Sequence, residues 1–363
     1  MTSAAGTGVH GRLAGLDLIR GIAIGLVLLR HAWPEIVGSG GIVGVVAFFA
    51  LSGYLITGIL MKDVRSRGRV RYGRFYRNRA LRLFPPLLFM LAGFVVVTLT
   101  LNPLDDRDGI VRAIFTAVTY TGNLPYDHGS AAVDHLWTLA TEEQFYLVWP
   151  LILTFAFRRK SMGRAFGIST VLLATAVVAS ILLTAPNIHR IYTLPTSWAI
   201  AMIIGAAAKV WEHQVRGTMP TWFTPRAGGS AAALILVALS FIPDPKNSPF
   251  GYLLLGPVVA VVTVALMMAW SSWRDLPSPV LRPLLALGTI SYAAYLWNYP
   301  IVLWLGDRPL SPIAAIGSIV LTIVAATASW WLVERPVQAL RKRLDRPARP
   351  ASPPVEQPAS DMR

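Results

Sequence analysis

The chain has 363 residues, of which 54% are hydrophobic and 14% are charged. A soluble domain carries about 25% charged residues, so this composition excludes an ordinary soluble protein and indicates several membrane-spanning segments. The absence of cysteine excludes disulfides, thiol catalysis and cysteine-bound metals. The net charge is +15, but the basic residues lie between apolar runs, which indicates membrane topology rather than nucleic-acid binding.

The apolar runs predict an all-α integral membrane protein with about ten transmembrane helices. In chain order they cover residues 13–33, 42–60, 83–101, 136–157, 165–184, 195–211, 229–243, 252–272, 284–305 and 312–333. The sixth and seventh are short for a full crossing, which takes about 20 residues. A short helix is also expected around residues 110–120, in the long polar connection after the third segment.

The first segment contains DLIRGIAIGLVLLRH at 17–31, which holds charges that lipid disfavours. Arg20 and His31 are eleven residues apart, or about 1100° of helix, so they share a face and lie roughly 16–17 Å apart along the axis. A charge that faces lipid costs at least ~2.5 kcal/mol, so this face is expected to turn into the protein. The alternative is a structural Asp17–Arg20 ion pair with His31 at the membrane interface.

The connection between the second and third segments is strongly basic and is predicted to be an inner loop. Residues 61–82 hold nine lysines and arginines. Arg79 and Arg82 stand three residues apart just before Pro85 and Pro86, and paired guanidinium groups suit phosphate recognition. The alternative is attraction to anionic lipid headgroups, worth about 1 kcal/mol per basic residue.

The fourth segment carries two adjacent carboxylates, Glu142 and Glu143, within an apolar run. Such a pair is costly in a membrane, so basic partners are expected on other helices. The alternatives are an ion pair that only holds helices together, or a glutamate still at the outer interface. In the ninth segment, Ser291, Tyr295 and Asn298 form a polar stripe at i, i+4, i+7 spacing, for which helix packing is the simpler interpretation.

The basic residues predict the orientation of the chain. If the N-terminus is cytoplasmic, 26 of the 33 lysines and arginines fall in cytoplasmic segments. Both termini are therefore predicted to be cytoplasmic, in the plasma membrane. Residues 1–340 are expected to form one transmembrane domain, and residues 341–363 a basic, proline-rich, disordered tail.

Several motifs together resemble the membrane-bound acyltransferase 3 family. The first-helix pattern of an arginine, ten residues and a histidine matches Arg20 and His31. The other matching runs are GGIVGVVAFFALSGYLI at 40–56, RALRLFPP at 79–86, HLWTLATEEQFYLVWP at 135–150, SYAAYLWNYP at 291–300 and ERP at 334–336. The resemblance covers roughly residues 13 to 340. Val46 and Asn298 depart from it, since many members have aspartate and histidine there.

The resemblance implies an O-acyltransferase that takes an acyl group, acetyl by preference, from cytoplasmic acyl-coenzyme A. The acceptor would be a hydroxyl of an extracytoplasmic saccharide or glycolipid, or of a secondary metabolite such as a macrolide. His31 would act as general base or carry the acyl group itself. Arg20 would orient the donor or stabilise developing negative charge.

The remaining site residues are assigned by the same resemblance. Arg79 and Arg82 would clamp the coenzyme phosphates, and the Ser52 hydroxyl would pack between helices or line the donor path. Glu142 or Glu143 would hold His31 or Arg20 in place. No metal is expected. The competing hypotheses are a multi-span transporter of a polar molecule or glycan, to which buried charges are also suited, and a catalytically inactive scaffold.

Overall fold

The structure, a computed structural model, describes residues 14–184, 187–273, 275, 277–306 and 309–344. Within these residues all regular structure is helical, which confirms the predicted all-α fold. The predicted tail lies outside the described residues from residue 345 onward. Residues 341–344 are helical and end the last helix.

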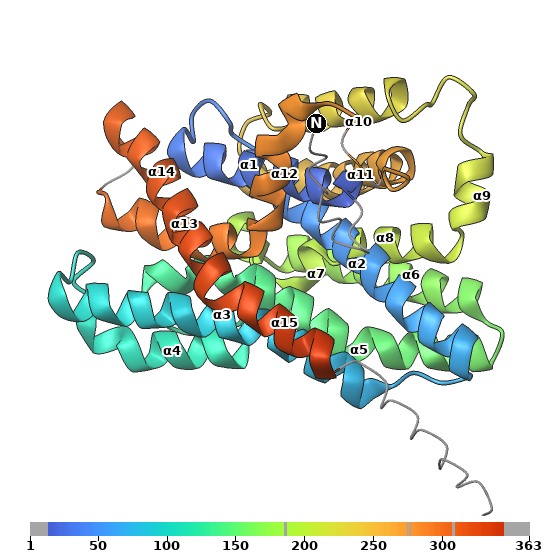
Figure 1. Cartoon of the computed structure of the whole chain (residues 1–363), viewed down its shortest axis with the longest axis horizontal. Helices are drawn as coiled ribbons and strands as arrows, with labels where there is room; N and C mark the ends of the chain where they lie inside the picture. The colour runs from blue at the N-terminus through green and yellow to red at the C-terminus, as the bar shows by residue number, and fades with distance from the viewer. Residues whose placement is uncertain (1–13, 185–186, 274, 276, 307–308, 345–363) are drawn as a thin grey trace, which may run out of the picture.

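The chain contains both long and short helices (Figure 1). The long helices are α1 (Ala14–Ala32), α2 (Gly40–Arg67), α3 (Tyr72–Thr100), α5 (Trp137–Arg158), α6 (Met162–Thr184), α11 (Gly256–Trp270), α13 (Ser291–Trp304) and α14 (Pro312–Ser329). The shorter ones are α4 (Ile110–Thr119), α7 (Pro195–Trp198), α8 (Ile200–Val210), α9 (Glu212–Gly217), α10 (Ala227–Leu239), α12 (Arg282–Thr289) and α15 (Arg335–Leu344).

Several short turns matter for the site. The 3-10 turn η2 (Ala131–Leu136) leads into α5, and the π turns η5 (Gly251–Leu255) and η7 (Trp330–Glu334) lead into α11 and α15. Every one of the ten predicted segments is helical, and the short helix expected around residues 110–120 is α4. The sixth segment is divided between α7 and α8, and the ninth between α12 and α13.

Length and apolar character identify membrane-crossing candidates within the described residues. Five helical segments qualify: Gly40–Arg67, Tyr72–Thr100, Met162–Thr184, Gly251–Trp270 and Pro312–Leu344. The pair Pro279–Thr289 and Ser291–Trp304, bent by 70°, makes a sixth if its two arms form one span. The helix α6 exposes almost its whole apolar surface, which lipid accommodates and water would not. The chain is a multi-span membrane protein.

The predicted inner loop of residues 61–82 is wrong in extent. Helix α2 continues to Arg67 and α3 begins at Tyr72, so residues 68–71 alone separate them. Gly68, with φ of 69°, adopts the left-handed conformation that ends many helices. Hydropathy marks where a helix enters lipid, whereas arginine-rich sequence continues the helix beyond that point because arginine is a good helix former. Arg79 and Arg82 therefore stand on α3 itself.

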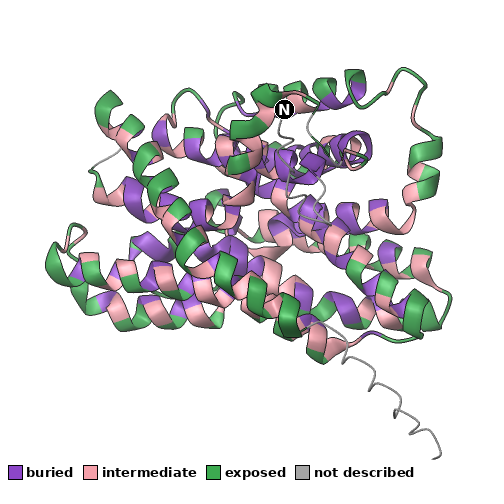
Figure 2. Ribbon diagram, viewed as in Figure 1, coloured by how far each residue is buried: buried purple, intermediate pink, exposed green. Residues whose placement is uncertain are grey.

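The core lies where α1, α2, α8 and α11 pack together. Figure 2 shows buried residues gathered in this central region, with exposed residues on the outward faces of the surrounding helices. The helices α14, η7 and α15 form one long helical run, and its C-terminal part packs against α3 (Figure 1).

The helices α1 and α12 approach closely through two glycines. A Cβ atom on Gly288 would lie 1.8 Å from the carbonyl oxygen of Asp17, and one on Gly21 would lie 2.1 Å from that of Leu284. No side chain fits at such distances, so small residues allow the backbones to meet. The contact holds the part of α1 that carries Arg20.

We expect Gly288→Ala to destabilise the protein by about 1–3 kcal/mol, because the added methyl group forces α12 away from α1. The measurement is the thermal unfolding midpoint in detergent. Gly317→Ala in α14 is the matched control, since a Cβ atom there meets no atom within 4 Å, and alanine is the better helix former by about 1 kcal/mol. Equal midpoints for the two variants would contradict the close contact.

Candidate functional site

The helix α1 contributes to two separate cavities. Arg20, near its N-terminal end, lines a cavity that we call the arginine cavity, and His31, near its C-terminal end, lines one that we call the histidine cavity. The predicted placement of both residues on one helix is confirmed. The Asp17–Arg20 ion pair of the alternative interpretation is also present, with Arg20 Nη1 2.6 Å from Asp17 Oδ1.

The arginine cavity lies among α1, α2, α3, α5 and α13 and has about 840 Å³ of empty space, part of it open to solvent. It is the size of a small-molecule site. Among its lining residues are five of the seven predicted site residues: Arg20, Ser52, Arg79, Arg82 and Glu142.

Arg79 of α3 is the basic partner of the two glutamates. A basic partner on another helix was expected because burying charges in lipid is costly. Arg79 Nε and Nη2 both donate to Glu143 Oε1 at 3.0 Å, and Nη2 lies 3.9 Å from Glu142 Oε2. The guanidinium carbon of Arg79 also lies 3.2 Å from the centroid of the Tyr146 ring. These contacts hold Arg79 against α5.

The expectation that a glutamate holds His31 or Arg20 is wrong. Glu142 accepts a hydrogen bond from Ser52 Oγ at 2.8 Å and faces the arginine cavity, while Glu143 binds Arg79. Arg20 takes its carboxylate from Asp17, one turn away on its own helix. A partner on the same helix face needs no second helix to bring it close.

We expect Arg79→Leu and Glu143→Leu each to destabilise the protein by about 3–5 kcal/mol, because each leaves a buried charge without its main partner. The double variant should lose less than the sum, by about 1–3 kcal/mol. Thermal unfolding of the four proteins in detergent measures this coupling. Strict additivity would show that the Arg79–Glu143 contact contributes nothing.

The histidine cavity is larger, with about 1140 Å³ of empty space that includes part of the opening to solvent. Its lining combines aromatic rings with charged and hydrogen-bonding groups: Arg30, His31, His128, Asp134, His135, Trp137, Thr138, Tyr192, Asp244, Lys246, Tyr295 and Tyr299. The rings of His31 and His135 both pack on Tyr299, with centroid separations of 5.2 Å and 5.4 Å.

Asn298 contacts His31 in the structure but was not among the site residues expected from sequence. Its Oδ1 lies 2.5 Å from His31 Nδ1, and its Nδ2 donates to Thr322 Oγ1 at 3.2 Å. The sequence placed Asn298 in a polar stripe that suggested packing. The missed signal was that a side chain in this stripe both donates and accepts, and so can join a histidine to a further helix.

The hydrogen bonds around Asn298 determine the tautomer of His31. Thr322 Oγ1 gives its proton to the Ser318 carbonyl at 2.6 Å, so it accepts from Asn298. The Asn298 nitrogen therefore faces Thr322, and its oxygen faces His31. His31 Nδ1 must then donate, and in the neutral ring Nε2 carries the lone pair that can accept a proton.

His135 is unsuited to take a proton although it lines the same cavity. Burial, with a smaller effect from His31, lowers the pKa of His135 to about 3. His135 Nε2 lies 3.2 Å from the Leu296 carbonyl and donates to it. This ring therefore stays neutral and serves as a wall of the cavity.

The two cavities meet at a shared wall. Val45, Thr138 and Tyr295 line both of them. Thr138 Oγ1 donates to the Tyr295 hydroxyl at 2.6 Å, which donates to the His135 carbonyl at 2.6 Å. A few side chains therefore separate the region of Arg20 from that of His31. Val46, one residue beyond Val45, lies in the apolar core.

Comparison with known proteins identifies relatives along most of the chain. The family model for an acyltransferase domain, the acyltransferase 3 domain, matches residues 13–335. The "Putative peptidoglycan O-acetyltransferase YrhL" of Bacillus subtilis is 31% identical over 366 residues, which cover 91% of this chain and 55% of that protein. "O-acetyltransferase OatA" of Staphylococcus aureus is 27% identical over 351 residues, covering 90% of this chain and 57% of that protein.

The chain thus spans a little over half the length of these two relatives. No solved structure matches it.

Proposed function

The chain belongs to the acyltransferase 3 family, as its motifs predicted, and from this premise we propose that it is a membrane O-acyltransferase. It would move an acyl group, acetyl by preference, from cytoplasmic acyl-coenzyme A to an acceptor hydroxyl. The observation that carries the proposal is the course of α1, which brings Arg20 to one cavity and His31 to another across a shared wall. One cavity would receive the donor and the other the acceptor.

The proposed topology is the one that the basic residues favour, with ten spans and both termini cytoplasmic, in the plasma membrane. The basic connection between α2 and α3 would then lie on the cytoplasmic side, near the arginine cavity. His31 would lie toward the outer side. This orientation supplies the donor from the cytoplasm and leaves the histidine cavity accessible to an extracytoplasmic acceptor.

The arginine cavity suits an anionic donor. Arg20 and Arg82 line it as cations, and Ser52 and Glu142 add a hydrogen-bonded polar pair. From the sequence, Arg79 was expected to clamp a phosphate. In the structure it is held by Glu143 and Tyr146, so we propose that it shapes the cavity. The narrow thioester arm would pass Val45, Thr138 and Tyr295 toward His31.

His31 would act as the general base. Its Nε2 takes the proton of the acceptor hydroxyl while the oxygen attacks the thioester carbonyl carbon, and the carbon–sulfur bond breaks as the new ester forms. The proton then passes from His31 to the departing thiolate, so the ring returns to its starting state. Because Asn298 Oδ1 accepts from Nδ1–H, Nε2 is the ring nitrogen that takes up this proton and gives it back.

We propose a cell-envelope saccharide as the acceptor. The two named relatives carry the words peptidoglycan O-acetyltransferase and O-acetyltransferase in their names. The rings of Trp137, Tyr192 and Tyr299, with charged groups beside them, form a lining that combines apolar faces with hydrogen-bonding groups. Sugar rings present both kinds of surface.

The test is turnover by the full chain purified in detergent. Acetyl-coenzyme A is supplied with peptidoglycan-derived glycan fragments, and in parallel with a macrolide, and both free thiol and product mass are measured. We expect thiol release that depends on the glycan, with one acetyl mass added to it. Glycan uptake into proteoliposomes without thiol release would instead identify a transporter.

A second readout distinguishes the two roles open to His31. Acid-quenched enzyme, incubated with donor alone, is digested and examined by mass spectrometry. We expect unmodified His31. An acetyl group on the peptide that contains His31 would replace the general-base mechanism with an acyl-histidine intermediate.

A further inference from the structure

A third hollow, which we call the α15 hollow, lies beside the arginine cavity. Arg20, Arg82 and Tyr292 line both, so the two are contiguous. Its far side is formed by η7 and α15, which contribute Glu334 and Arg341 among others. Three guanidinium groups, from α1, α3 and α15, thus line one hollow.

The spacing along η7 and α15 accounts for this face. Glu334, Gln338 and Arg341 follow i, i+4, i+7 spacing, so they lie on one side of the helix, and all three line the hollow. Both η7 and α15, which carry these residues, pack against α3, the helix of Arg82. Pro336 has no backbone N–H for the carbonyl of Leu332, and the wider π turn η7 lies at this point.

The charges in the α15 hollow are unbalanced. Asp17 neutralises Arg20. In the part of the chain that the structure describes, neither Arg82 nor Arg341 has a carboxylate partner, and Glu334 is the acidic residue of the lining. Arg82 lies within electrostatic range of three cations, Arg20, Arg79 and Arg341, and of the carboxylates Glu142 and Glu143, which Arg79 already pairs with. Like charges at close range repel, so an anion between them would be stabilised.

We propose that the α15 hollow binds a phosphate group of the coenzyme A donor, with Arg82 and Arg341 as its principal ligands. The proposal rests on the proposed acyltransferase function and adds a residue of the last helix to the donor site. Guanidinium groups bind phosphate oxygens through paired hydrogen bonds. A lipid headgroup offers the same chemistry, and the experiment separates the two sources.

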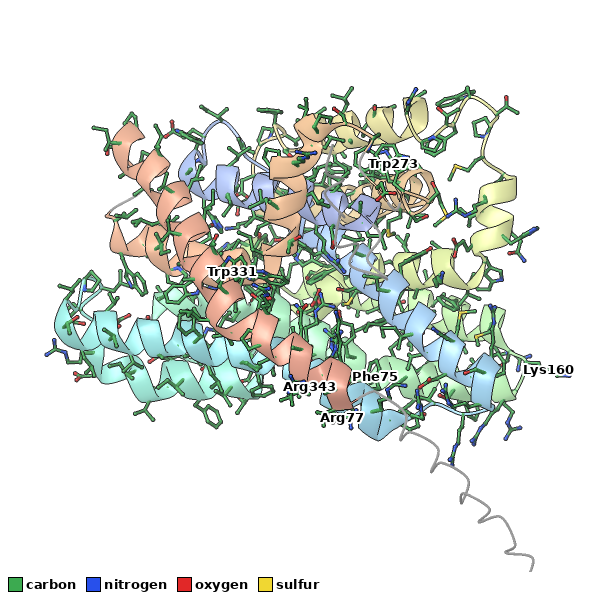
Figure 3. All side chains as sticks on the ribbon, in the orientation of Figure 1. Phe75, Arg77, Lys160, Trp273, Trp331 and Arg343 are labelled. Atoms are coloured by element: carbon green, nitrogen blue, oxygen red, sulfur yellow. The ribbon has the colours of Figure 1, made fainter. Side chains whose placement is uncertain are left out.

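The experiment is calorimetric titration of the purified full chain with coenzyme A. We expect Arg341→Gln to weaken binding about tenfold, the loss of one charge-assisted contact, and Arg341→Lys to weaken it less. Arg343→Gln is the matched control: Arg343 lies two residues further along the same helix and is exposed (Figure 3). It should bind as the unchanged protein does. Equal affinities for Arg341→Gln and Arg343→Gln, with both proteins folded, would overturn the proposal.

Shortened ligands locate the phosphate. If Arg341 binds the 3′-phosphate, dephospho-coenzyme A should bind the unchanged protein and Arg341→Gln equally. If it binds the diphosphate, dephospho-coenzyme A should still distinguish them and pantetheine should not. A difference that persists with pantetheine would show a general structural effect and contradict the proposal.

Binding to vesicles that contain phosphatidylglycerol tests whether the hollow takes a lipid headgroup instead. A loss of vesicle binding in Arg341→Gln with unchanged coenzyme A affinity would assign the hollow to lipid and overturn the proposal. Titration also separates this inference from the function on which it rests. Coenzyme A binding that depends on Arg341 without any acyl transfer would refute the enzyme alone, and transfer that is indifferent to Arg341 would refute this site alone.

Discussion

His31→Gln is expected to reduce acyl transfer by about 10²–10⁴-fold, the range that a positioned general base contributes. Glutamine keeps a polar side chain of similar reach beside Asn298 but has no basic nitrogen. Donor binding should change little, because Arg20 and Arg82 line a different cavity from His31. The measurement is kcat from thiol release, together with coenzyme A affinity from titration.

The control for this variant is His189→Gln. His189 is exposed in the 3-10 turn Ile188–Ile191, so its replacement should leave kcat unchanged. The thermal unfolding midpoints of both variants report whether they fold. A folded His31→Gln protein that retains the full rate would remove His31 from the mechanism.

Asn298→Leu is expected to lower kcat by about 10²-fold, because the ring of His31 loses the acceptor that fixes its tautomer and orientation. The KM for acyl-coenzyme A should stay unchanged, since Asn298 is buried beside His31 and does not line the arginine cavity. A folding defect would lower only the concentration of active enzyme. When rates are normalised to that concentration, such a defect leaves kcat unchanged, whereas loss of the Asn298 hydrogen bond lowers it.

Asn298→His sharpens the test. A neutral histidine can donate to Thr322 from one nitrogen and accept from His31 at the other, which reproduces the two roles of the amide. We expect this variant to retain most of the rate. Equal losses in the leucine and histidine variants would show that the size of Asn298 matters and its hydrogen bonds do not. The same reasoning explains how asparagine can stand where many family members have histidine.

The helical segments could be predicted from sequence because apolar runs of spanning length have few alternatives in lipid. The shared helix of Arg20 and His31 followed from the same regularity, since spacing along a helix determines both angle and rise. The ends of α2 and α3 could not be predicted in this way. Basic residues mark the membrane boundary, but they do not end a helix.

The partners of the buried charged groups could not be predicted from the sequence, because they come from different helices. The need for a cation near Glu142 and Glu143 follows from the cost of burying charge. The choice of Arg79 depends on how α3 packs against α5. In the same way, the link from His31 to Asn298 joins positions 267 residues apart, and no local spacing reports such a distance.

By itself the sequence determined a helical membrane protein with the motifs of an acyltransferase family, since apolar length and motif order are local properties of the chain. Tertiary structure alone decided that Arg20 and His31 face two cavities, that Asn298 sets the tautomer of His31, and that Arg341 joins Arg82 in one hollow. These are contacts between helices. Packing of close backbones, as at Gly288 and Asp17, determines which side chains meet.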